Sequence, residues 1–180
     1  MSFNSYRGIW FALVVLLVYQ LIKVHKNQNI FLLCASLYFY ATSSILFTSL
    51  LLATIYIGFS SVLKIIHTLE KGKSTRTHMV MSIAALITML GIFKYHNFFV
   101  ESFATTLNSF GLNPNFSTLK IILPVGISFY IFQTIGYIID VARKDTKAHS
   151  DIVEFALFVS FFPQLVEGPI ERSKNFLKQT

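Results

Sequence analysis

Long apolar runs separated by short basic segments dominate the chain. The first run, residues 8–22, is uncharged and is followed by KVHK at 23–26. No small-residue cleavage site follows it, so we interpret it as a retained helix and not as a signal peptide. Residues 27–63 carry no charge, and as one helix they would extend roughly 55 Å, against about 30 Å for a hydrocarbon core. This stretch must therefore fold back, and its polar break, ATSS at 41–44, predicts two helices.

The second half of the chain has a less regular pattern. Residues 79–93 form an uncharged run that ends in KYHN at 94–97, a sequence typical of an interfacial anchor. Apolar positions then recur at helical spacing up to residue 110, which fits either an amphipathic helix in the membrane interface or a short loop helix packed on protein. Residues 121–139 are a further uncharged run. The last run, 155–166, gives only about 18 Å of helix and contains Pro163, so we expect it to be re-entrant.

These runs predict an all-α fold, namely a polytopic transmembrane helical bundle with an interfacial helix and a re-entrant segment, all within one domain over residues 1–180. We expect spans at about 8–23, 28–41, 44–64, 79–95 and 120–140, the interfacial helix at about 97–110 and the re-entrant segment at about 151–172.

Composition supports a chain that is solvated by lipid. Apolar residues make up 54% of the sequence, charged residues 13%, and mean hydropathy is +0.62, which excludes a disordered chain and a disulfide scaffold and disfavours a water-soluble domain. The net charge of +7 comes from basic residues in the gaps between apolar runs, so anionic lipid is a better partner than nucleic acid. Most of them fall in loops that would be cytoplasmic if the N-terminus lies outside. The single cysteine, Cys34, is expected to be a buried small hydrophobe.

No signature of a soluble enzyme occurs in the sequence, and no set of residues has metal-ligand spacing. The histidines all fall in loops or at predicted membrane borders, where most such side chains are simply solvated. We assign neither catalysis nor metal binding to any of them: His25, His67, His78, His96 and His149.

Two clusters place polar residues in apolar surroundings. In the first, LPVGISFYIFQTIGYIID at 123–140, Gln133 and Asp140 are seven residues apart and share one helix face. In the second, FFPQLVEGPIER at 161–172, two prolines and a glycine predict non-helical backbone near membrane depth, which must be buried by protein or line a wet cavity. Polar residues of this kind line functional pathways or serve as helix-to-helix contacts, and the residues alone leave both interpretations open.

The extended forms of these clusters, LPVGISFYIFQTIGYIIDVARKD and FFPQLVEGPIER, closely resemble the membrane-bound O-acyltransferases, in the branch that acetylates alginate and related polysaccharides. Residues 3–6, 33–40 and 93–98 fit the same branch, so the resemblance covers nearly the whole chain. Two departures are visible: Ala142 replaces a usual aromatic residue, and Glu167 stands where a small residue is usual.

The resemblance implies tilted helices around a funnel, in which an acyl group from a cytoplasmic thioester, acetyl-CoA or another, meets a hydroxyl acceptor from the other side. No bound cofactor is implied, and periplasmic or surface partner proteins are expected. The family's expected general base is a histidine within Trp-His-Gly, which this sequence lacks, since its only tryptophan, Trp10, precedes Phe11. We therefore expect the N-terminal portion of an enzyme, without a catalytic residue of its own, inactive alone and unstable when isolated.

The function that follows is transfer of an acyl group, expected to be acetyl, to hydroxyls of an exported polysaccharide or cell-wall glycan. The alternative is a non-catalytic transport or scaffold subunit, which the absence of a base in these residues also permits. In either case the residues expected to line the substrate tunnel or to support the two motifs are Pro124, Gly126, Ser128, Gln133, Asp140, Arg143, Pro163, Gln164, Gly168, Pro169 and Arg172.

Overall fold

The structure is a computed structural model that describes residues 6–109, 126–146 and 151–161. Within these ranges all regular secondary structure is α-helical, which confirms the expected fold class. The helices are α1 (Tyr6–Leu21), α2 (His25–Ser43), α3 (Ile45–Glu70), α4 (Arg76–Ser109), α5 (Ile127–Ala142) and α6 (Ile152–Ser160).

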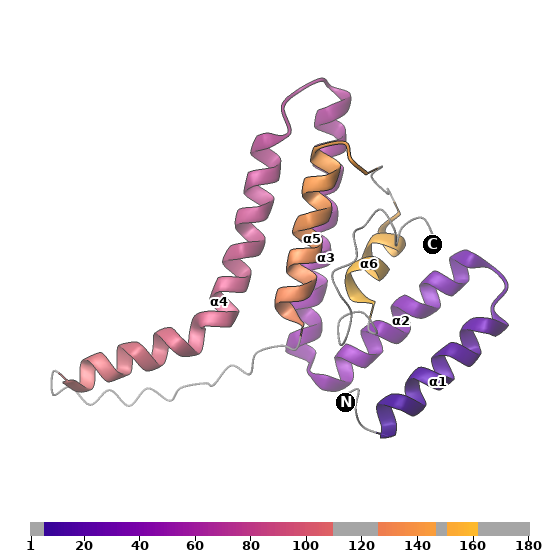
Figure 1. Ribbon diagram of the computed structural model, residues 1–180, viewed down its shortest axis with the longest axis horizontal. Coiled ribbons are helices and arrows are strands. Elements are labelled where there is room, and N and C mark those ends of the chain that lie inside the picture. The colour runs from indigo at the N-terminus through magenta and orange to yellow at the C-terminus, as the bar shows by residue number, and fades with distance from the viewer. Residues whose placement is uncertain (1–5, 110–125, 147–150, 162–180) are drawn as a thin grey trace.

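Helix α5 is the central element of the bundle. It lies beside α3 and the first part of α4, while α6 packs across α2 and also contacts α3 and α5, and α1 runs along α2 (Figure 1). Ile131 and Ile138 of α5 are completely buried, as are Leu51 and Val62 of α3. The core of the described residues is therefore the seam around α5, where the first motif is located.

Large apolar side chains also cover the outside of the bundle. Ile45 is 81% exposed, Tyr56 74% and Met81 65%, a pattern that water does not favour and that lipid does. Among the residues that the structure describes, two helical segments, Ile45–Glu70 and Arg76–Tyr95, are long and apolar enough to cross a membrane. The chain is thus membrane-associated. Cys34 lies on this outer surface, so the expectation that it is buried is wrong. The expectation failed because a helix in lipid carries apolar residues on both faces, so an apolar run does not show which of its residues are buried.

Charged residues mark where lipid ends, not where helices end. The basic segment 23–26 already includes the start of α2, and α3 continues past its predicted end at residue 64 to Glu70. It stops where Gly72 takes the left-handed conformation (φ +65°). There the Gly72 N–H donates to the Leu69 carbonyl at 3.0 Å and the Lys73 N–H to that of Thr68 at 3.1 Å, which is the Schellman termination.

The largest difference from the predicted elements is in α4. A span at 79–95 and a separate interfacial helix at 97–110 were expected, but residues Arg76–Ser109 form one helix. Its later part turns away from the bundle (Figure 1). The anchor sequence at 94–97 contains neither proline nor glycine, so no residue in it is of a type that ends a helix. Of the predicted re-entrant segment, only residues up to 161 are described; the turn near Pro163 lies outside the described residues.

Candidate functional site

The first motif lies on α5, which carries all of the predicted site residues that the structure describes. Gly126 and Ser128 lie at its start, Gln133 at its middle, and Asp140 and Arg143 at its end. The other predicted residues lie outside the described residues: Pro124, Pro163, Gln164, Gly168, Pro169 and Arg172.

Gly126 forms the entry to α5. It is the N-cap residue, with φ +82° and ψ +1°, a left-handed conformation that costs a side-chain-bearing residue about 1–2 kcal/mol. Its carbonyl accepts the Tyr130 N–H at 3.1 Å, which starts the helix. Ser128, in the first turn, is half-buried. The glycine of the motif therefore sets the direction from which the chain enters α5.

Gln133 joins α5 to α6. Its side chain is 4% exposed, and its Nε2 donates to the Phe158 carbonyl at 2.9 Å. Phe158 is in the last turn of α6, whose carbonyls have no partner within the helix. Because Ser160 at the end of α6 is fully buried, this end has no access to water, and the amide supplies a donor in its place. The hydrogen bond connects the first motif to the helix that leads directly into the second.

Asp140 and Arg143 belong to the termination of α5. The Asp140 carbonyl accepts the Asp145 N–H at 2.9 Å, and Val141 accepts from Lys144 at 3.1 Å. Lys144 has φ +64°, so this is the same Schellman geometry as at Gly72, with a lysine in the left-handed position. Asp140 is half-buried and Arg143 exposed. Gln133 and Asp140 are two turns apart, about 10 Å along the axis, so the structure does not bring them into one site.

Two buried hydroxyl groups, one on α2 and one on α5, were missed by the sequence analysis. Ser36 on α2 and Tyr130 on α5 are 0% and 1% exposed, and neither side-chain oxygen has a hydrogen-bond partner among the described residues. Tyr40, one turn after Ser36, belongs to the same core cluster as Tyr130. The i, i+4 spacing of Ser36 and Tyr40 in an apolar run was the available signal.

A polar cavity of about 180 Å³ lies between the first turns of α2 and α6. It contains charges of both signs, and Asp151 caps α6 by accepting the Val153 N–H at 2.8 Å. Mixed charge of this kind selects neither a cation nor an anion. Among the described residues, no three potential metal ligands come together. The cavity is lined by His25, Lys26, Asn29, Asp151, Val153 and Glu154.

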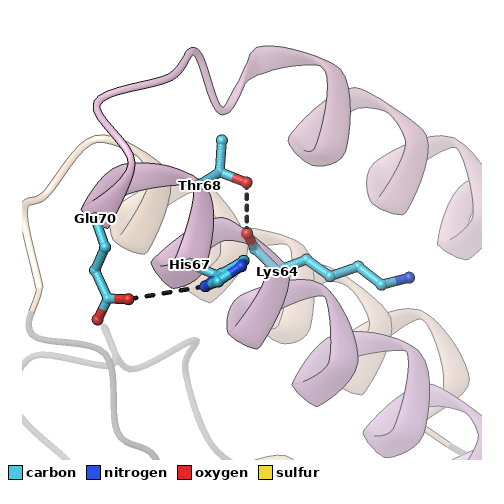
Figure 2. A network of polar contacts seen from close by, with 4 residues as sticks. All are labelled: Lys64, His67, Thr68 and Glu70. Carbon is cyan, nitrogen blue, oxygen red and sulfur yellow. Dashed lines mark hydrogen bonds and ion pairs between the residues drawn. The ribbon is translucent and has the colours of Figure 1, made fainter.

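His67 lies on the surface near the end of α3. Its Nδ1 lies 3.9 Å from Oε2 of Glu70, and both side chains are about two-thirds exposed. Nearby, the Thr68 hydroxyl donates to the Lys64 carbonyl at 2.7 Å, so this end of α3 carries a small network of surface contacts (Figure 2). An exposed pair of this kind contributes little to stability and lacks the desolvation that tunes a catalytic base.

Comparison with known proteins confirms the resemblance that the two motifs suggested. The chain is 36% identical over 179 residues to "Probable alginate O-acetylase AlgI" of Pseudomonas putida, covering 99% of this chain and 37% of that protein. The protein of the same name from Pseudomonas aeruginosa is 35% identical over 99% of this chain and 34% of its own length. "Peptidoglycan O-acetyltransferase" of Helicobacter pylori is 29% identical over 94% of this chain and 36% of its own length.

The chain therefore spans about a third of the length of the curated relatives it matches. No protein-family model matches it, and no solved structure does.

Proposed function

Because the chain aligns along nearly its whole length with members of the membrane-bound O-acyltransferase family, we propose that it forms part of an enzyme that transfers an acyl group to a glycan hydroxyl. In this reaction the hydroxyl oxygen forms a new C–O bond to the acyl carbonyl carbon, and the C–S bond of the thioester donor breaks. The hydroxyl proton passes to a general base and from there to the thiolate that leaves. The base would be the family's Trp-His-Gly histidine, which is not among these residues.

The observation that carries this proposal is the alignment of 99% of the chain with acetylases at 34–36% identity. The relatives' names support acetyl as the acyl group and an exported polysaccharide or the cell-wall glycan as acceptor. They do not favour the alternative of a transport or scaffold subunit. The donor in this proposal is acetyl-CoA or another acyl thioester, and the enzyme works with periplasmic or surface partner proteins that position the glycan or pass on the acyl group.

The role of these residues within the enzyme is structural support of the two motifs. Gln133 ties α5 to the end of α6, three residues before the second motif begins. The left-handed Gly126 and the Schellman turn at Lys144 fix both ends of α5. A reaction site in lipid needs such fixed backbone, because polar groups there have no water to compensate for misplacement.

We also propose a multi-pass topology in the bacterial inner membrane with the N-terminus outside. Its support is the concentration of basic residues in alternate loops. After Cys34→Ala, a single cysteine placed at Ser173 would report the side of the tail. We expect protection from a membrane-impermeant maleimide in intact cells and labelling after permeabilisation. Labelling in intact cells would mean that residues 151–172 cross the membrane completely.

The activity is tested in a strain that lacks the gene. We expect acetate released by mild base from the surface polysaccharides to fall to background and to return when the intact gene is supplied in trans. Acetyl content that remains unchanged in every surface glycan after deletion would refute the proposal.

A further inference from the structure

The polar cavity between the first turns of α2 and α6 is large enough to hold a ligand group. It measures about 180 Å³, whereas a water molecule takes about 30 Å³ in the liquid. Asn29 is the most buried residue of its lining, at 8% exposed. The Asn29 side chain makes no hydrogen bond to another residue that the structure describes. Because a buried amide needs a partner, the cavity is where that partner would bind.

One side of the cavity suits a phosphate group. Lys26 supplies a positive charge there and makes no ion pair with a described residue. Helix α2 begins at the same place, and its N-cap residue, Val24, provides no side-chain cap. The N–H groups of the first turn therefore receive no acceptor from the N-cap side chain. A helix N-terminus in this state, next to a lysine, favours an anion.

The other side of the cavity suits a primary ammonium group. The carboxylates of Asp151 and Glu154 line it. Oδ1 of Asp151 accepts the Val153 N–H at 2.8 Å, and a carboxylate keeps further lone pairs for an ammonium, which has three donors. A quaternary ammonium has no donor and is bound by aromatic faces instead, but the described lining contains no tryptophan, tyrosine or phenylalanine. The cavity therefore fits a ligand that carries both a phosphate and a primary ammonium.

Apolar residues beside the cavity indicate that this ligand is a lipid. Val24 and Ile152 adjoin the lining residues in sequence and are 56% and 52% exposed, and Leu21, at the end of α1, is 79% exposed. A phospholipid places its headgroup in a polar cavity and its acyl chains on such side chains. A soluble phosphate compound would make no use of them.

We propose that this cavity binds the headgroup of a phospholipid with a primary ammonium, as in phosphatidylethanolamine. Its phosphate lies at Lys26 and the first turn of α2, and its ammonium lies at Asp151 and Glu154. Asn29 has both an amide donor and a carbonyl acceptor, so it can bond to either group. The bound headgroup joins the first turns of α2 and α6, and so stabilises the helix that leads into the second motif. Lipid binding is measured without acyl transfer, so this proposal and the proposed function can fail separately.

The test is native mass spectrometry of the intact protein in detergent. It measures the dissociation constants of short-chain phosphatidylethanolamine, phosphatidylcholine and phosphatidylglycerol, which differ only in headgroup. The variants are Lys26→Gln and Asp151→Asn; asparagine caps a helix about as well as aspartate, so the second variant removes a charge and keeps the cap of α6. The controls are Lys23→Gln, in the same basic segment, and Glu70→Gln on α3, because neither residue lines the cavity.

We expect phosphatidylethanolamine to bind about threefold to tenfold more tightly than either of the other lipids. Each cavity variant should weaken its binding about threefold to fivefold, and the controls should bind it as the wild type does. Lys26 and Asp151 are exposed without lipid, so neither variant should change the melting temperature of lipid-free protein.

Two kinds of result would overturn the inference. Equal affinities for the three lipids, or affinities that the cavity variants leave unchanged, would show ordinary lipid contact only. Tighter binding of phosphatidylglycerol, or displacement of phosphatidylethanolamine by inorganic phosphate, would show a site for anions. The comparison of the three lipids on the wild-type protein decides the headgroup preference even if a variant is unstable.

Discussion

Gly58 lies where three helices meet, and its replacement by alanine is a direct test of the packing. A Cβ at this position of α3 would lie 2.6 Å from Thr134 Cγ2 on α5 and 2.8 Å from Phe155 Cζ on α6. Neither neighbour can move aside easily. The Thr134 hydroxyl is held on the Tyr130 carbonyl at 2.8 Å, and the fully buried Phe155 ring packs 5.4 Å from that of Tyr137, centroid to centroid.

The magnitude follows from two opposing effects. Overpacking by a methyl group against fixed neighbours costs about 3 kcal/mol, at the upper end of the usual range. Alanine recovers about 1 kcal/mol through its higher helix propensity. We therefore expect Gly58→Ala to lower the free energy of unfolding by about 2 kcal/mol.

Denaturant-induced unfolding of the intact protein in detergent measures this difference. Gly91→Ala and Gly136→Ala are matched controls, because a Cβ at either position meets nothing within 4 Å; both should be neutral or stabilising by up to about 1 kcal/mol. In a Gly58→Ala background, Phe155→Leu removes the ring atoms that clash, so the double variant should be more stable than the two single effects predict. If Gly58→Ala were as stable as Gly136→Ala, the close approach of α3, α5 and α6 would be refuted.

Three further predictions concern helix ends and surface charge. Both Lys144 and Gly72 have a left-handed backbone conformation. Lys144→Gly should therefore raise the free energy of unfolding by about 1 kcal/mol, and Gly72→Ala should lower it by about as much. Thermal unfolding in which both variants shift in the same direction would contradict this. Gln133→Leu should lower the free energy of unfolding by about 1–3 kcal/mol because it removes the buried hydrogen bond to the Phe158 carbonyl, and an unchanged unfolding midpoint would refute the contact. Glu70→Gln should leave stability unchanged within error at any salt concentration, because its pairing is exposed.

The helices could largely be predicted because lipid imposes a simple rule. Apolar runs of membrane-crossing length, with a polar break near residue 44, place α1, α2 and α3 within a few residues of their positions in the structure, except at the far end of α3. That end was predicted too early because the hydropathy pattern reports the edge of the lipid, whereas Gly72 and its Schellman hydrogen bonds end the helix. For the same reason, the hydropathy pattern predicted two helices where the structure has the single helix α4.

The site could be predicted only in part, because a polar residue in an apolar run shows that it needs a partner without showing which one. Gln133 was identified from its position, but its partner is the Phe158 carbonyl, 25 residues away. Tyr130 and Ser36 were not identified, because tyrosine and serine are common in membrane helices and most hydroxyls there bond to their own helix. Only the three-dimensional arrangement separates those that do from those that do not.

The first motif supports the helix that precedes the second motif because of how α6 ends. A helix that stops in a buried environment leaves its last carbonyls without water, so at least one neighbouring element must supply donors. Gln133 supplies one to Phe158 from the middle of α5, and the position of α5 is set in turn by Gly126 and by the contact of Gly58 with Thr134. We therefore expect a change at any of these positions to disturb the end of α6, directly before the second motif, even though no residue of that motif is altered. The polarity of Gln133 is accounted for by its contact with the Phe158 carbonyl, so this glutamine needs no substrate to explain its place in an apolar run.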